Sequence, residues 1–334
     1  MKIAIVGAGA IGTSIGATLK KNGADVEFIV LTKKEKEISE TTGTRVSGVK
    51  GDFTVVVPAK LSLAELTEKK DVIIISTKAY NLGDLAKTAL SHITENGLIV
   101  SMQNGICAEI MEKTVGVKKT VMSAITFGAT LHNLMDSEIT SNGGFILGML
   151  DGSKPKQLCD LAELLNNSFV TNIADDILAE LYTKLIINSC ITAIGAICGL
   201  KLGEMMNQSY IRKIFISIVA ESVNVANAMK LSLPPFGDKL NYYKFLSGKG
   251  FLGNIKRNIM LKIVGSKYRN LKSSSLQSLE KGEPTEIDFF AGYILRKGDE
   301  FNIDTPVNDK IYAMVKEIEN GKRTINIENL NELK

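Results

Sequence analysis

The feature that most restricts the fold is a glycine-rich turn close to the N-terminus. Residues 2–6 predict a short apolar strand, the run GAGAIG follows at residues 7–12, and a helical pattern then continues to about residue 21. This is GxGxxG between a strand and a helix, the context in which the motif binds the pyrophosphate of a dinucleotide. A glycine-rich turn can also occur without a ligand, but this context favours a dinucleotide site of the Rossmann type.

The end of the second predicted strand bears on the choice of dinucleotide. The strand covers residues 26–31, and NAD-binding chains commonly place Asp or Glu at this end to hold the ribose hydroxyls. Here no carboxylate is in place, and Lys33 and Lys34 follow closely. Their ammonium groups favour the 2′-phosphate of NADP, although they could also be solvated loop charges. We therefore expect NADPH as the cofactor and leave NADH open.

Two further buried strands bring polar side chains to the same edge of the predicted sheet. Continuous apolar runs at residues 71–76 and 97–102 predict strands that are covered on both faces. Lys78 follows the first run and Asn104 follows the second. Ligands of open α/β sheets lie beyond the carboxyl ends of the strands, so we expect both side chains beside the dinucleotide. Taken singly, Lys78 could be a loop lysine, and Asn104 before Gly105 could be a turn residue.

The alternation of strand and helix ends near residue 172, which indicates a change of domain. Strand-like segments continue at 54–58, 120–126 and 144–148, and residues 153–166 predict a helix. After residue 175 helical patterns cover 175–200, 209–229, 254–265, 285–298 and 306–320. We therefore predict an α/β chain with a Rossmann-type parallel-sheet domain at residues 1–172 and an all-α domain at residues 173–334.

The most apolar of these helices carries polar side chains at one spacing. Residues 185–200 hold no charge, and sixteen residues are too few to span a bilayer, so a buried helix is predicted. Lys184, Asn188 and Thr192 follow one another at intervals of four, which places them on one helical face. A buried lysine is rare unless it is paired or functional, and desolvation shifts its pKa so that it can move protons. Lys184 could instead extend from the helix end toward water, with Asn188 as an ordinary buried amide.

Composition argues against several classes of function. The net charge of +4, from 40 basic and 36 acidic residues, does not argue for a nucleic-acid partner. With two histidines and no CxxC pair we expect no metal site, and the cysteines predict free thiols in a reducing compartment: Cys107, Cys159, Cys190 and Cys198. The chain starts directly with a strand, so we expect no signal peptide and a cytoplasmic location. The basic segment 239–272 is explained by a solvated helix face, or alternatively by attraction of an anionic substrate or by an oligomer contact.

The chain resembles the ketopantoate reductases (2-dehydropantoate 2-reductases) over nearly its whole length. The matching segments are GAGAIG at 7–12, TKA at 77–79, QNG at 103–105, AELYTKLIINS at 179–189 and SSLQSLEKGEPTEID at 274–288. The last two, in this order and spacing, are the specific ones. The family has a Rossmann domain followed by a helical domain, with the active site between them. The resemblance implies reduction of 2-dehydropantoate to D-pantoate with NADPH, in pantothenate and coenzyme A biosynthesis.

The resemblance also implies roles for individual residues. The catalytic lysine falls on Lys184, and the glutamate that assists it falls on Glu286. Substrate binding is implied for four residues: Asn104, Asn188, Thr192 and Ser274. Cofactor binding is implied for Gly7, Ala8, Gly9, Ala10, Ile11, Gly12, Lys33, Lys78, Asn104 and Glu286. The chain departs from the family's usual residues at Leu31 (Arg), Tyr182 (Trp), Thr192 (Asn) and Ser278 (Asp).

Other interpretations of the same residues stay open. Thr285 and Asp288 could simply cap the helix that follows, which would explain them but not Glu286. The chain could be a paralogue that reduces another 2-oxo acid, or a different dehydrogenase such as a 3-hydroxyacid, opine or glycerol-phosphate dehydrogenase. A non-catalytic NADP(H) sensor is a further class, although it would not need a buried Lys184. As partners we expect a small 2-oxo acid, neither nucleic acid nor a membrane, and, as an open alternative, a second copy in a homodimer.

Overall fold

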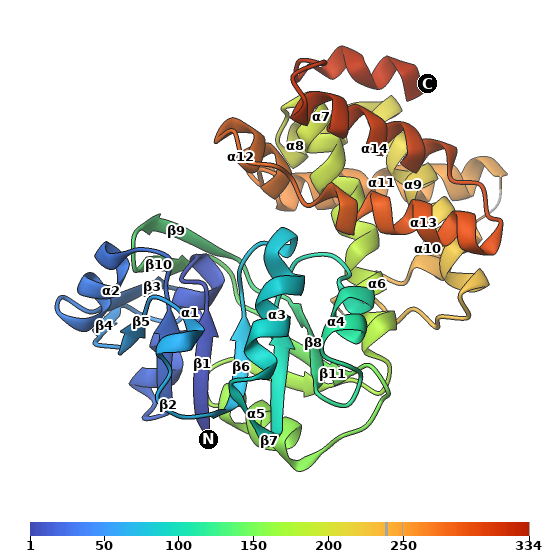
Figure 1. Ribbon diagram of the computed structural model, residues 1–334. Coiled ribbons are helices and arrows are strands. Elements are labelled where there is room, and N and C mark those ends of the chain that lie inside the picture. Colours follow the sequence, from blue (N-terminus) through green and yellow to red (C-terminus); the bar gives the residue numbers. More distant parts are fainter. Residues whose placement is uncertain (238–239, 249, 334) are drawn as a thin grey trace. The chain divides into compact units, whose positions relative to one another are not determined.

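The computed structural model describes residues 1–237, 240–248 and 250–333, and the chain divides into two compact units (Figure 1). The first unit is Met1–Glu180 and the second is Leu181–Lys334. The domain boundary between residues 172 and 173 stays a prediction.

The first unit is built on a sheet whose strand order, within the described residues, is β12-β11-β8-β7-β6-β1-β2-β5. The strands are β1 (Lys2–Val6), β2 (Asp25–Ile29), β5 (Ala59–Lys60), β6 (Lys70–Ile75), β7 (Ile93–Ser101), β8 (Thr120–Ile125), β11 (Gly144–Met149) and β12 (Val170–Ile173). Neighbouring strands are parallel except for β8 and β11, which are antiparallel. The sheet is therefore mixed, and the predicted α/β class is confirmed.

The order of the strands reverses beside β1. The chain runs from β1 outward through β2 to β5, and then returns to β6 on the other side of β1. The continuous apolar sequence of β6 is explained by its central place, because Val72, Ile73, Ile74 and Ile75 are all fully buried. In open α/β sheets, ligands bind at such a reversal, outside the carboxyl ends of the strands.

The helices of the first unit connect these strands. They are α1 (Ala10–Lys21), α2 (Lys33–Glu40), α3 (Leu82–Leu90), α4 (Ala108–Thr114) and α5 (Lys156–Asn166). Along α1, the residues from Gly12 to Leu19 are all buried. The helix predicted after the glycine turn is thus present and lies deep in the unit.

A second, small sheet accompanies α1 and is not expected from the sequence. Its order is β4-β3-β10-β9, from β3 (Thr44–Gly48), β4 (Phe53–Val55), β9 (Ala129–Asn133) and β10 (Asp136–Ile139). It packs on α1, where the hydroxyls of Ser14 and Ser137 are hydrogen-bonded at 2.9 Å. The strand predicted over residues 54–58 is only partly right, because β4 ends at Val55.

The second unit is helical, as predicted. Its elements are α6 (Ile177–Asn188, which begins in the first unit), a π-helical segment (Ser189–Ala193), α7 (Ile194–Cys198), α8 (Leu202–Asn207), α9 (Ser209–Ala228), α10 (Tyr242–Ser247), α11 (Gly250–Lys267), α12 (Ser274–Glu280), α13 (Ala291–Phe301) and α14 (Pro306–Glu319). The short helices α8 and α10 are not expected from the sequence. Glu221 on α9 caps α14, since its carboxylate accepts the backbone N–H groups of Val307 and Asn308 at 2.9 and 3.0 Å.

The continuous helical stretch Ile177–Cys198 is long and apolar enough to cross a membrane by length and composition. However, 78% of its most apolar window is buried inside the protein. A helix whose apolar surface is already covered by its own chain exposes little apolar surface that lipid could contact. This stretch is therefore the core helix of the second unit, as the sequence predicts.

Candidate active site

The turn between β1 and α1 has the geometry that a dinucleotide pyrophosphate requires. Gly7 has φ +99°, which favours glycine. A Cβ on Gly12 would lie 2.0 Å from the carbonyl oxygen of Gly7, whereas a Cβ on Gly9 would meet nothing within 4 Å. Gly12 thus allows close packing, and Gly9 leaves open space for a ligand. The N-terminus of α1 has no side-chain cap, so its first N–H groups suit a phosphate, and the residues present fit a dinucleotide.

Ser76, which no sequence motif singles out, holds this turn in place. Its hydroxyl lies at the end of β6 and donates to the carbonyl oxygens of Gly7 at 2.8 Å and Val6 at 3.1 Å. The hydroxyl oxygen of Ser76 would lie 2.4 Å from a Cβ on Gly12. Ser76 therefore joins the ends of β1 and β6 on either side of the strand-order reversal.

The residues after β2 form the start of a helix. β2 ends at Ile29, two residues earlier than predicted, and Leu31 is 90% exposed. Thr32 caps α2, with the carboxylate of Glu35 accepting the Thr32 backbone N–H at 2.7 Å. Lys33 and Lys34 are exposed on the first turn of α2, so they are helix residues and not loop residues. Glu35, which the sequence pattern does not single out, brings a carboxylate to this end of the strand, but this carboxylate is already bonded to Thr32 in the helix cap.

Lys78 and Asn104 follow two adjacent parallel strands, β6 and β7, as predicted. The buried Gln103 side chain connects the two strand ends. Its amide nitrogen donates to the carbonyl oxygens of Ile75 at 2.9 Å and Thr77 at 3.1 Å, and its amide oxygen accepts the Ser101 hydroxyl at 2.5 Å. Lys78 directly follows the bonded Thr77, and Asn104 directly follows Gln103. Gln103 thus fixes the backbone that carries both predicted site residues.

In the second unit, Lys184 lies on α6 in surroundings that disfavour its charge. The residue is half-buried, with buried neighbours Thr183 and Leu185 on either side. Burial lowers the pKa of Lys184 from 10.5 to about 8, and the negative charge of Glu286 acts in the opposite direction. Glu286 is itself only 8% exposed. The two residues paired by the resemblance therefore interact electrostatically within this unit.

The segment that carries Glu286 is attached to α14 on both sides. Before it, the Thr285 hydroxyl donates to the Glu319 carboxylate at 2.6 Å. After it, the Asp288 carboxylate accepts the Tyr312 hydroxyl at 2.7 Å and the Lys316 ammonium at 3.2 Å. The predicted capping pattern of Thr285 with Asp288 is wrong, because Asp288 bonds to α14 and not back to the Thr285 backbone. The attachments instead hold Glu286 in position.

Thr192 lies in the π-helical segment that follows Asn188. In a regular α-helix, residues eight positions apart are displaced by roughly 80° around the axis. A π turn holds about one residue more than an α turn, which reduces this displacement. Thr192 is buried, and the π turn keeps it closer to the face of Lys184 and Asn188 than an α-helix would.

Ser274 is the exposed first residue of α12, which packs on the π-helical segment and on α7. The preceding Ser273 caps α12 by accepting the Leu276 N–H at 3.1 Å. A Cβ on Gly195 would lie 2.9 Å from the Ser273 Cβ, so this glycine permits the close approach of the two elements. The second unit thus gathers the predicted residues on three segments that are in contact or electrostatically coupled.

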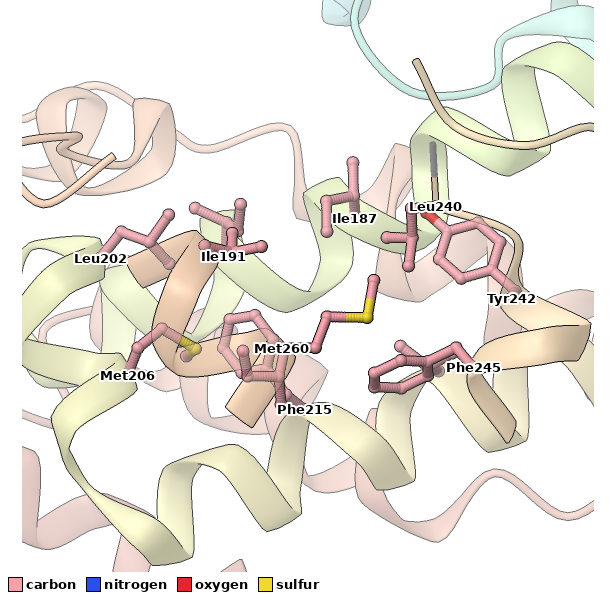
Figure 2. Close-up of a pocket in the computed structure, with 12 residues that line it drawn as sticks. Ile187, Ile191, Leu202, Met206, Phe215, Leu240, Tyr242, Phe245 and Met260 are labelled. Carbon is pink, nitrogen blue, oxygen red and sulfur yellow. The ribbon is translucent and has the colours of Figure 1, made fainter. Parts of the chain in front are cut away.

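An apolar cavity of about 40 Å³ lies in the second unit next to α6 (Figure 2). Ile187 and Ile191 line it from α6 and the π-helical segment, and Met206, Phe215 and Met260 line it from α8, α9 and α11. A cavity with room for little more than a water molecule and no polar lining stays dry. It is therefore a packing feature of the helical core and not a substrate site.

Sequence comparison identifies the family. The family model described as "Ketopantoate reductase PanE/ApbA" matches residues 3–152, and the model described as "Ketopantoate reductase PanE/ApbA C terminal" matches residues 176–319. The chain belongs to the ketopantoate reductase family. It is therefore an oxidoreductase, and the resemblance stated from the sequence is confirmed.

Individual relatives extend over nearly the whole chain. The 2-dehydropantoate 2-reductase of Archaeoglobus fulgidus is 27% identical over 322 residues, covering 96% of this chain and 98% of the relative. That of Pyrococcus abyssi is 27% identical over 319 residues, covering 95% and 97%.

Solved structures share the fold. A PanE/ApbA family ketopantoate reductase from Ralstonia eutropha JMP134 has a TM-score of 0.82 at 22% identity, covering 97% of this chain and all of that one. D-mandelate dehydrogenase with NADH and anilino(oxo)acetate has a TM-score of 0.80 at 24% identity, with the same coverage. The family is one of nicotinamide-dinucleotide-dependent reductases.

Proposed function

We propose that the protein reduces 2-dehydropantoate to D-pantoate with NADPH, as a cytoplasmic enzyme of pantothenate and coenzyme A biosynthesis. The observation that carries this proposal is the lowered pKa of Lys184. Burial lowers this pKa to about 8, and the negative charge of Glu286 opposes the change. Such a group is mostly protonated at neutral pH and titrates close to it, which suits a proton donor to a ketone oxygen. The relatives named 2-dehydropantoate 2-reductase support the choice of substrate.

In this mechanism a bound nicotinamide cofactor supplies a hydride to the ketone carbon. Protonated Lys184 stabilises the negative charge that grows on the ketone oxygen and delivers the proton to it. Glu286 favours the protonated form of Lys184 before the reaction. Asn188, Thr192 and Ser274 would hydrogen-bond the substrate's carboxylate and hydroxyl groups and fix their orientation.

The chain's own residues would also hold the cofactor. The turn from Gly7 to Gly12 and the uncapped N-terminus of α1 would bind the pyrophosphate. Lys78 and Asn104 would contact the dinucleotide or the substrate from the carboxyl ends of β6 and β7. Lys33 would bind the 2′-phosphate that distinguishes NADPH from NADH.

Replacing both Lys33 and Lys34 by Ala should raise the KM for NADPH by about tenfold and leave the KM for NADH nearly unchanged. The reason is that the exposed ammonium groups interact with a phosphate that only NADPH carries. Steady-state kinetics with each cofactor checks this. The matched control replaces Lys20 and Lys21, at the far end of α1, and should affect neither cofactor. Equal effects on both cofactors, or a wild-type preference for NADH, would contradict the assignment.

The substrate can be tested with a panel of 2-oxo acids, each supplied with NADPH and with NADH, while the nicotinamide absorbance is followed. We expect the highest kcat/KM for 2-dehydropantoate. A higher value for another acid would favour a paralogous reductase, for which Thr192 in place of the family's usual asparagine is the specific observation. Absence of turnover with every acid would favour a non-catalytic dinucleotide sensor.

A further inference from the structure

The helical turn that carries Lys184 is bonded to a tyrosine from a distant part of the second unit. Tyr242, the first residue of α10, is 1% exposed, and its hydroxyl donates to the backbone carbonyl oxygen of Thr183 at 2.9 Å. The backbone N–H of Ile187 donates to the same hydroxyl. In a regular α-helix these two backbone groups, four residues apart, bond to each other. The Tyr242 hydroxyl therefore bonds to both partners of the helical hydrogen bond that encloses Lys184.

The helix stays irregular beyond this turn. Asn188 follows it directly, and the next residues form the π-helical segment Ser189–Ala193. The Ser189 hydroxyl is buried and has no hydrogen-bond partner within the described residues, which lowers stability. Turns of the π type are rare and frequently lie at functional sites. These features coincide on the stretch that holds Lys184, Asn188 and Thr192, so the backbone geometry is explained if it serves the position of these side chains.

We propose that Tyr242 is a positioning residue for the reduction: its hydroxyl fixes the turn of α6 that carries Lys184 and so holds the ammonium group where it meets both Glu286 and the ketone oxygen. This inference rests on the proposed function, because it takes Lys184 as the proton donor. The tyrosine ring lines the apolar cavity next to α6 together with Ile187 and Phe245 (Figure 2), while the hydroxyl reaches the helix backbone. A displacement of about 1 Å at a reacting group can lower a rate by roughly a hundredfold, so one backbone bond at this place is sufficient to matter.

The Tyr242 hydroxyl stays protonated over the pH range in which Lys184 titrates. Burial raises the pKa of Tyr242 well above its ordinary value, the nearby Cys190 thiol raises it further, and the backbone hydrogen bond from Ile187 acts in the opposite direction. Burial also raises the pKa of the Cys190 thiol, so both groups remain neutral. A change in the pH–rate profile after replacement of Tyr242 would therefore not arise from titration of the tyrosine or of the thiol.

Tyr242→Phe tests the inference, because it removes the hydroxyl and keeps the buried ring. We expect kcat for the reduction to fall by about tenfold or more, because Lys184 is no longer held in place. The KM for the cofactor should stay unchanged, since the glycine turn belongs to the first unit. The basic limb of the pH–rate profile should move to lower pH, because a displaced Lys184 is influenced less by the negative charge of Glu286.

Tyr182→Phe is the matched control. The Tyr182 hydroxyl is also fully buried, but it donates to the backbone carbonyl oxygen of Ser222 on α9, at 3.0 Å, and not to the backbone of α6. The control should lower the melting temperature about as much as Tyr242→Phe and leave kcat and the basic limb unchanged. The inference is overturned if Tyr242→Phe lowers only the melting temperature, or if Tyr182→Phe lowers kcat to the same extent.

A titration without substrate separates this inference from the proposed function. In protein labelled with carbon-13 at the lysine Cε atoms, NMR gives the pKa of Lys184, whose signal is assigned from its absence in Lys184→Arg. We expect a lower pKa in Tyr242→Phe than in the wild type and an unchanged pKa in Tyr182→Phe, and equal values in all three proteins would overturn the inference. Failure of the proposed function would instead appear as absent turnover in the wild type, or as a basic limb that persists in Lys184→Ala. In that case the titration still decides whether Tyr242 sets the position of Lys184.

Discussion

Replacing Lys184 by Ala should lower kcat for the reduction by about 10²–10⁴-fold, the usual contribution of a positioned proton donor. Dinucleotide binding should be retained, because the glycine turn that fits the pyrophosphate belongs to the first unit. We therefore expect a strongly reduced kcat, measured by steady-state kinetics, together with an unchanged cofactor affinity, measured by nicotinamide fluorescence. A variant that reduces 2-dehydropantoate at close to the wild-type rate would exclude Lys184 as the general acid.

The pH dependence gives a second measurement of the same role. A general acid must be protonated to act, so the reduction should slow as pH rises through the pKa of Lys184, about 8, while the reverse oxidation should gain. Lys184→Arg serves as the control, since arginine keeps the positive charge but does not titrate in this range. It should retain some affinity for the substrate and lose the basic limb of the pH profile.

The same pKa has a consequence for stability. Lys184 binds a proton less tightly in the folded chain than in the unfolded chain, where its pKa is 10.5, so folding disfavours the charged form. Between about pH 8 and 10.5 the unfolded state therefore holds more protons, and the free energy of unfolding should rise with pH over that interval. Burying Lys184 in its charged form thus lowers the stability of the folded chain at neutral pH, so the position of this lysine is better explained by chemistry than by stability.

The features that local sequence determines could be predicted. The apolar strands β1, β6 and β7 and the glycine turn depend on residues that are adjacent in the chain, and their patterns have few alternatives. The apolar helix around Lys184 is equally local. The small sheet next to α1 could not be predicted, because its strands have only three to five residues, β9 is mostly exposed, and β10 contains a single apolar residue.

The contacts that hold the candidate site in place depend on residues far apart in sequence. Ser76 bonds to Gly7 across 69 positions, and Thr285 bonds to Glu319 across 34 positions. No local pattern distinguishes either contact. The capping interpretation of Thr285 and Asp288 was wrong for this reason, since α14 offers both residues partners that the local sequence does not show. Nor does the sequence near Thr192 contain a signal for the π turn.

Glu286→Gln should lower kcat by about tenfold or more at neutral pH, because it removes the charge that opposes the desolvation of Lys184. Without that charge the pKa of Lys184 falls further below 8, so a larger fraction of the lysine is neutral and unable to donate a proton. The basic limb of the pH–rate profile should accordingly move to lower pH. The melting temperature should change little, since the attachments to α14 are made by the neighbouring Thr285 and Asp288.

Glu283→Gln is the matched control for this prediction. Glu283 lies three residues before Glu286 and is exposed, so the substitution removes the same charge from the same segment without affecting a buried group. A helix-capping or purely structural role for Glu286 would lower the melting temperature and leave the basic limb where it is. A shift of the limb in Glu286→Gln, and none in Glu283→Gln, can arise only if Glu286 acts on the proton of the catalytic group. If Glu286→Gln changes neither the rate nor the basic limb of the pH–rate profile, Glu286 has only a structural role.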